Sequence, residues 1–138
     1  MLIKLSRVFE YDDTGWNCQE KRLLEPTWNA LESAVRRLNK FQFPFIWFFL
    51  SKDAADDALP DFSIMGGEGD YVMSTFDSER IDRHIRFPSH SDKRIDVWLS
   101  DQGCDFEEQF VCHDIDFVLD VLRRYADSGQ FPSDILWE

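Results

Sequence analysis

The fold class follows from one stretch of sequence, FSIMGGEGDYVMSTF, residues 62–76. Two β-prone segments, 62–65 and 71–76, flank five residues of which three are glycine. Glycine adopts positive φ at no steric cost, as tight hairpin turns require. A phosphate-binding loop is the competing interpretation, but such a loop precedes a helix and often carries a lysine. Here a strand follows, and the charged neighbours are Glu68 and Asp70. We therefore predict an antiparallel hairpin.

Strand signals continue on both sides of this hairpin. Residues 45–50, Phe-Ile-Trp-Phe-Phe-Leu, would be apolar on both faces of a strand, which predicts a central place in the sheet. The turn residues Asp-Asp-Thr-Gly at 12–15 end a first strand. The further strands that we predict are 2–9, 82–87, 94–99 and 106–112.

Two segments carry the periodicity of amphipathic helices. In residues 26–39, Pro26 suits the first helical position, and apolar side chains from Trp28 onward recur at helical spacing. The second helix begins after Asp114, a suitable N-cap, and stops at Gly129. The order of elements predicts an α+β fold: a single domain over residues 1–138, with a mostly antiparallel sheet packed with two amphipathic helices.

The charge balance restricts the possible partners. The chain has 27 acidic and 15 basic residues, a net charge of −12. Binding to nucleic acid depends on cations that neutralise phosphates, so neither nucleic acid nor an anionic membrane is an expected partner. A basic protein is the expected partner, because opposite charge speeds its encounter. Composition alone leaves open that the charge serves only solubility.

The candidate partner-binding residues are acidic side chains in two clusters and one tryptophan. Neither cluster has the spacing of a calcium-binding loop, so we predict no metal ion and no other cofactor. Trp16 follows a turn and is a candidate hydrophobic anchor. The clusters are Asp53, Asp56, Asp57 and Asp61, and Asp101, Asp105, Glu107 and Glu108.

No combination of residues in the sequence indicates catalysis. The three histidines, His84, His90 and His113, show no HxxxH spacing, and no serine lies in a GxSxG motif. We therefore expect a protein that is not an enzyme. For Cys112 we expect a buried structural cysteine. The alternative is a small hydrolase that uses His90 or Cys112 with nearby carboxylates, in which a neighbouring helix start would lower the pKa of the Cys112 thiol.

The sequence also predicts a cytoplasmic location. The sequence has three cysteines, an odd number, and no CxxC pair, which suits a reducing compartment. No continuous apolar segment follows Met1, so we expect no signal peptide. The most apolar run, residues 41–50, is about half of the ~20 residues that a membrane helix needs.

Three stretches of the sequence occur together in one order. They are Glu25-Pro26-Thr27-Trp28 with the helix that follows to Leu38, the Gly-Gly hairpin over residues 62–72, and residues 118–138 with their helix, Gly129, Pro132 and Trp137. Together they resemble a family of bacterial polymorphic-toxin immunity proteins, immunity protein one (Imm-one). The resemblance implies a role, a protein that binds a cognate secreted toxin domain and occludes its active site, and not a named target. Many such toxins are nucleases or nucleic-acid deaminases, whose basic substrate channels would suit an acidic partner. It implies no catalytic residues. The alternative function is a non-catalytic cytoplasmic interaction module or adaptor.

Overall fold

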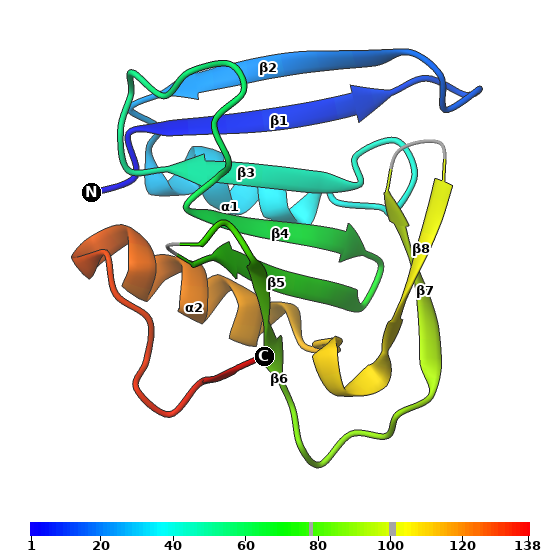
Figure 1. Ribbon diagram of the computed structural model, residues 1–138. Coiled ribbons are helices and arrows are strands. Elements are labelled where there is room, and N and C mark those ends of the chain that lie inside the picture. The colour runs from blue at the N-terminus through cyan, green and yellow to red at the C-terminus, as the bar shows by residue number, and fades with distance from the viewer. Residues whose placement is uncertain (78, 100–101) are drawn as a thin grey trace.

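Seven antiparallel strands form the main sheet of the computed structural model, in the order β2-β1-β3-β4-β5-β6-β9 (Figure 1). The structure describes residues 1–77, 79–99 and 102–138, without the side chains of residues 95–99 and 102–105. The strands are β1 Leu5–Tyr11, β2 Cys18–Leu24, β3 Phe45–Phe49, β4 Phe62–Gly67, β5 Asp70–Phe76, β6 Asp82–Arg86 and β9 Leu136–Trp137. A separate antiparallel hairpin consists of β7 Arg94–Leu99 and β8 Gln102–Glu107.

The predicted glycine-rich hairpin is confirmed as β4 and β5. Its strands pair as far as Gly67 opposite Asp70, so the turn consists of Glu68 and Gly69 alone and is tighter than the predicted five-residue connection. Both turn residues have positive φ, 53° and 92°, as a two-residue turn that matches the twist of the strands requires.

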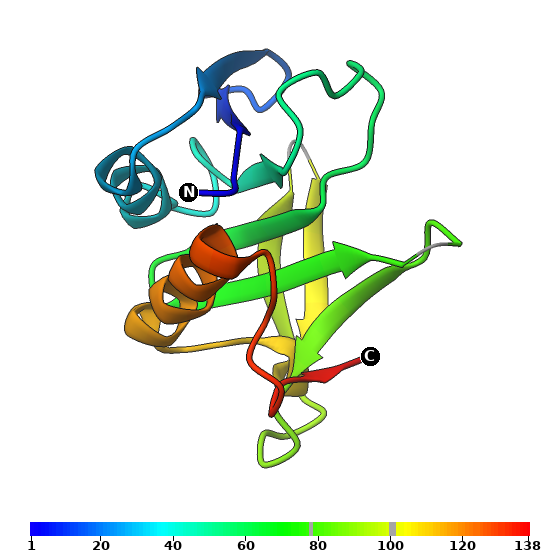
Figure 2. The same cartoon turned by 90° about the vertical axis from the view of Figure 1, so that its left-hand side faces the viewer.

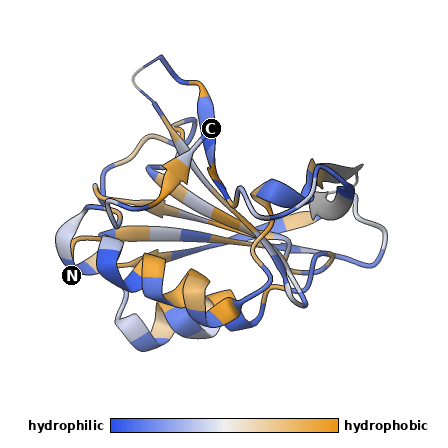
Figure 3. Cartoon of the chain, turned by 90° about the horizontal axis from the view of Figure 1, so that it is seen from below, coloured by the Kyte–Doolittle hydropathy of each residue, from blue (hydrophilic) through white to orange (hydrophobic). Residues whose placement is uncertain are grey.

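Both helices cover the same face of the sheet (Figure 2). They are α1, Trp28–Arg36, and α2, Ile115–Ser128. Their apolar sides meet the sheet across a core that includes Leu31, Phe48 and Phe62, each fully buried. Figure 3 shows the alternation of hydrophobic and hydrophilic residues along the helices that produces this packing. The predicted α+β architecture, with a mostly antiparallel sheet and two amphipathic helices, is confirmed.

The ends of the helices test the predicted capping residues. Asp114 accepts a hydrogen bond from the Asp116 backbone, and Gly129 ends α2 with φ of 72°, so both predictions are confirmed. The predicted start of α1 at Pro26 is wrong by two residues. Thr27 is the N-cap, because its side chain accepts a hydrogen bond from the Ala30 backbone 3.2 Å away.

Two strand predictions need correction. Strand β2 was not predicted, because CQEKRLL is mostly exposed at the sheet edge and lacks an apolar face. It pairs with β1 along its whole length through a turn in which the Asp12 carboxylate accepts hydrogen bonds from Thr14 and Asn17. These bonds lower the pKa of Asp12 to about 2. The predicted strand 106–112 is β8 up to Glu107 and then a 3-10 helix, η1, Glu108–Phe110.

The small hairpin packs against the main sheet. Strand β7 contacts β4 and β5, and Phe106 of β8 packs on Val72 and Val111.

Neither described helix combines the length and apolar character needed to cross a membrane.

Gly67 offers a test of this architecture. A Cβ atom at Gly67 would lie 2.3 Å from the Leu38 carbonyl oxygen in the segment after α1, whereas a Cβ atom at Gly69 meets nothing within 4 Å. Both positions have positive φ. We expect Gly69→Ala to lower the free energy of unfolding by about 1–2 kcal/mol, the cost of the conformation alone.

Gly67→Ala adds the steric conflict to that cost, and we expect a loss of about 3 kcal/mol or more. Urea denaturation of the two variants measures the difference. Equal losses would contradict the close approach of β4 to the segment that follows α1.

Candidate functional site

The face of the sheet opposite the helices carries a groove of about 530 Å³, here called the aromatic groove. It exists because successive side chains of a strand point to opposite faces. In β3, Ile46 and Phe48 are fully buried in the core, while Phe45 and Trp47 are half-buried on the other face. The lining residues are Tyr11, Phe45, Trp47, Leu59, Pro60, Ser63, Met65, Ser74, Phe76, Asp82, His84 and Phe106.

The aromatic rings at one end of the groove are held in a packed array. Phe9 lies 4.7 Å from Phe45 and 5.0 Å from Trp47, measured between ring centroids, with the second pair edge to face. The guanidinium of Arg7 lies over the rings of Phe9 and Trp47 at 5.5 and 5.2 Å. Such contacts stabilise one arrangement of the rings. A ligand would therefore meet a largely ordered surface.

Arg7 itself is 8% exposed and needs a partner. Its Nε and Nη2 atoms donate to the two carboxylate oxygens of Glu20 at 2.5 and 2.7 Å, a bidentate pair. Its Nη1 donates to the backbone carbonyl of Asp56. Arg7 lowers the pKa of Glu20 and keeps that carboxyl ionised. The same cation thus fixes both the aromatic rings and the loop between β3 and β4.

A serine, a histidine and an aspartate meet in the floor of the groove. Ser74 Oγ and His84 Nδ1 share a hydrogen bond of 2.6 Å, and His84 Nε2 lies 3.3 Å from Asp82. Burial lowers the pKa of His84, which favours the neutral ring. Ser74, however, is 3% exposed, and it lies in paired backbone between Ser63 and His84. A nucleophile needs access to substrate and free donors for an oxyanion. The geometry therefore favours a structural role for these three polar residues in the groove floor over a catalytic one.

The first acidic cluster lies in the β3–β4 loop and at its end. This loop crosses the helix-free side of the sheet (Figures 1 and 2), where Leu59 and Pro60 line the groove. Asp56 is paired with Arg22, and the Asp61 carboxylate accepts a hydrogen bond from the Leu50 backbone. The remaining members, Asp53 and Asp57, are exposed, and neither carboxylate is paired with another described residue.

The second cluster is only partly described. Asp101 lies outside the described residues, and so does the side chain of Asp105. Glu107 accepts a hydrogen bond from Gln109, and Glu108 lies in η1 near His90 and His113. Phe106, between the cluster members, lines the groove. The two acidic segments therefore contribute to the same groove, one through Leu59 and Pro60 and the other through Phe106.

The third candidate, Trp16, lies at the β1–β2 turn and is 78% exposed. It is not among the lining residues of the groove. The groove itself was not predicted from the sequence, because its lining residues come from six strands and a loop. One signal was present: a strand that is apolar on both faces must present one set of rings to whatever covers the second face.

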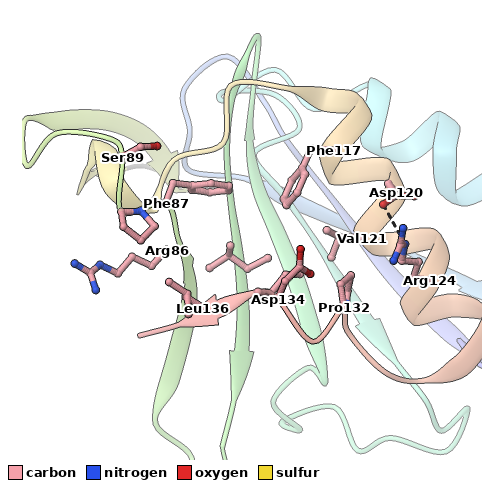
Figure 4. A pocket seen from close by; sticks show the side chains of 13 residues that line it. Arg86, Phe87, Ser89, Phe117, Asp120, Val121, Arg124, Pro132, Asp134 and Leu136 are labelled. Carbon is pink, nitrogen blue, oxygen red and sulfur yellow. Dashed lines mark ion pairs between the residues drawn. The ribbon is translucent and has the colours of Figure 1, made fainter.

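A second cavity, of about 290 Å³, lies between β6, α2 and the C-terminal segment (Figure 4). Its two arginines are already paired: Arg124 with Asp120 at 3.1 Å, and Arg86 with Glu138 at 3.1 Å. An anionic ligand would have to displace these carboxylates. The aromatic groove is larger and more apolar, and it is the better candidate site.

Cys112 does not have the properties of a reactive thiol. It is a buried free cysteine, and burial raises the pKa of its thiol, whereas a nucleophile needs a lowered one. The buried structural cysteine that the sequence favours at this position is confirmed, and the alternative, in which the helix start lowers the thiol pKa, is contradicted because burial outweighs it.

Comparisons with known proteins give a fold and no function. No family model matches the chain, and no curated protein does. The structure is similar to that of a hypothetical protein from Neisseria gonorrhoeae, with a TM-score of 0.60 and 11% sequence identity. The match covers 96% of this chain and 92% of the other. At this identity the likeness concerns the fold alone.

His84 makes the free energy of unfolding depend on pH, and this dependence can be measured. Burial lowers its pKa below 6.5, so the unfolded chain binds this proton more tightly than the folded protein does. The contribution of His84 to stability is therefore fully present above pH 6.5 and is lost as the pH decreases through the interval between the two pKa values. We expect the loss of unfolding free energy between pH 7.5 and pH 5 to be smaller in His84→Asn than in the wild type.

Asparagine keeps a polar group near Ser74. The carboxylates are the same in both proteins, so their contributions to the pH dependence cancel in the comparison. Urea denaturation at several pH values provides the measurement. Parallel pH profiles for the two proteins would show that burial does not shift the pKa of His84.

Proposed function

We propose that this protein is an immunity protein, which binds a cognate secreted bacterial toxin domain and occludes its active site. The observation that carries the proposal is the aromatic groove between two acidic segments on the helix-free face of the sheet. The sequence resemblance to the Imm-one family supplies the kind of partner. The net charge of −12 favours a toxin domain with a basic substrate channel, as in a nuclease or a nucleic-acid deaminase.

Aromatic side chains in the groove would supply the affinity. Tryptophan, tyrosine and phenylalanine are enriched at the centres of protein interfaces, and a few such residues carry most of the binding energy. Tyr11, Phe45, Trp47 and Phe76 are half-buried, so a partner would remove the rest of their surface from water. The ordered packing of Phe45 and Trp47 on Phe9 reduces the entropy lost on binding.

The negative charge would raise the rate of association with the toxin and the selectivity of binding. An enzyme that acts on nucleic acid presents cations to phosphates, and a protein with a net charge of −12 is attracted to that surface. Asp53 and Asp57 contribute most directly, since their carboxylates are exposed and unpaired with described residues. Trp16 is a further candidate contact outside the groove, because it is exposed at a turn.

The second candidate is a non-catalytic interaction module or adaptor in the cytoplasm. It would use the same groove and acidic loop for a different partner. The free cysteines Cys18 and Cys112 suit the reducing cytoplasm in either case. Gene neighbourhood separates the two proposals, because an immunity gene is expected beside the gene of a large secreted toxin.

The deciding experiment is co-expression of this chain with the toxin domain encoded beside its gene. We expect the wild type to restore growth and to form a stable complex with the toxin. Trp47→Ala should weaken binding by about 2 kcal/mol, roughly thirtyfold, and reduce protection, because a central aromatic contact is lost. Growth curves and calorimetry of the purified pair provide the readouts.

Trp28→Ala is the matched control. Trp28 is also half-buried and also stacks on an arginine, Arg123 at 4.8 Å, but it lies on α1, on the other side of the sheet. Its loss should leave toxin affinity unchanged. Failure of the wild type to bind or protect against any neighbouring toxin would exclude the immunity function.

The acidic loop gives a separate prediction. The double variant Asp53→Lys/Asp57→Lys should lower the association rate constant at least tenfold at low salt, because it reverses charge beside the groove. The dissociation rate constant should change less. Stopped-flow association measured over a series of salt concentrations gives both the rate and its salt dependence.

A double variant with the same change in net charge, Asp116→Lys/Asp127→Lys on α2, is the control. Both positions are exposed on the helix that covers the opposite face of the sheet. Equal slowing by the two double variants would show that net charge alone attracts the partner and that the loop has no special role.

A further inference from the structure

A group of metal-binding side chains outside the aromatic groove consists of His90, Glu108 and His113. One ligand atom from each residue lies within 4.8 Å of the others. His90 belongs to the connection between β6 and β7, Glu108 begins η1, and His113 directly precedes the N-cap of α2. The three are not close in sequence, so their meeting is a property of the fold.

The hydrogen bonds of the two histidines leave one nitrogen of each ring available. His113 Nδ1 lies 3.0 Å from a carboxylate oxygen of Asp70 and 3.3 Å from the Gly69 carbonyl. His90 Nδ1 lies 3.2 Å from the backbone oxygen of Glu108. These partners accept hydrogen bonds, so Nδ1 carries the proton in each neutral ring and Nε2 has the free lone pair. Metal-bound histidines are commonly held this way, by a carboxylate or a backbone carbonyl.

The residues behind the cluster are themselves fixed. The second carboxylate oxygen of Asp70 accepts from Lys40 at 2.5 Å, which orients the partner of His113. The ring of His90 stacks on that of His113, with centroids 5.5 Å apart, and on the ring of Phe87 at 5.1 Å.

Backbone hydrogen bonds join the segments that carry the cluster. Phe87 donates to Gln109, Gln109 donates to Ser91, and Glu108 donates to Lys93, at 2.5, 2.9 and 2.7 Å. They tie the β6–β7 connection to η1 on both sides of His90. The backbone positions of His90 and Glu108 relative to each other are therefore set before any ion binds.

Glu108 supplies the negative charge of the group. Its carboxylate makes no ion pair or hydrogen bond with another residue that the structure describes. Two imidazole nitrogens and one carboxylate are a ligand set typical of zinc, with water completing a tetrahedron. Zinc–ligand distances of about 2.0–2.2 Å place ligand atoms about 3.3–3.5 Å apart. The ligand atoms, which lie within 4.8 Å of one another, would reach this separation by rotation of these partly exposed side chains.

We propose that His90, Glu108 and His113 form a binding site for a divalent transition-metal ion, with Zn²⁺ the best match. Bound there, the ion would link the β6–β7 connection, η1 and the start of α2. Phe106, at the end of β8 just before η1, lines the aromatic groove, so the ion would also brace one wall of that groove. The site does not depend on the identity of the partner or on the immunity function.

The test uses full-length protein without an affinity tag, stripped with EDTA and dialysed. Titration with zinc sulfate at pH 7.5 in a calorimeter should give one site per chain and a rise in melting temperature. Cobalt(II) should give the visible absorption bands of a tetrahedral complex. Glu108→Gln and His113→Gln should each weaken zinc binding at least tenfold, and Asp70→Asn, which changes the partner of His113, should weaken it about tenfold.

Glu79→Gln is the matched control, since it makes the same change as Glu108→Gln at an exposed carboxylate outside both the cluster and the groove. Its zinc affinity should equal that of the wild type within about twofold. Melting temperatures measured in EDTA show that each variant folds. The proposal is overturned if no saturable binding occurs below about 100 μM zinc, if Glu108→Gln and His113→Gln bind as the wild type does, or if Glu79→Gln abolishes binding.

Discussion

The whole structure depends on a sheet that helices cover on one face only. Strand β3 shows the consequence, because it carries large apolar side chains on both faces. Ile46 and Phe48 complete the core beneath α1 and α2, and Phe45 and Trp47 face the other way. The β3–β4 loop and the β7–β8 hairpin flank this second face without filling it. A partly exposed apolar surface of this kind is typical of a binding site.

Arg7 connects the aromatic and the charged parts of that face. Its guanidinium stacks on Phe9 and Trp47, pairs with Glu20 and holds the backbone of Asp56. One buried cation therefore positions both the rings and the acidic loop. In the proposed complex the two parts have separate roles: exposed carboxylates affect mainly the rate of encounter, whereas buried rings affect mainly the lifetime of the complex.

The β7–β8 hairpin relates the groove to the histidine cluster. Phe106 lies on the wall of the groove, and two residues later Glu108 faces His90 and His113. A bound metal ion would stabilise the segment between these points through the rigid attachment of η1. The groove and the proposed metal site thus share a structural element while differing in their chemistry.

The sequence by itself determined the features that local interactions control. The glycines of residues 62–76, the Asp114 N-cap and the Gly129 stop predicted the hairpin and α2, because positive φ and capping involve only neighbouring residues. Strand β2 was missed because its pairing with β1, and not an apolar pattern, makes it a strand. Only the tertiary structure decided which side chains meet across the groove and that His90, Glu108 and His113 converge. Those encounters join residues far apart in the chain, and their distances depend on strand register and on how the hairpin packs, which no short stretch of sequence encodes.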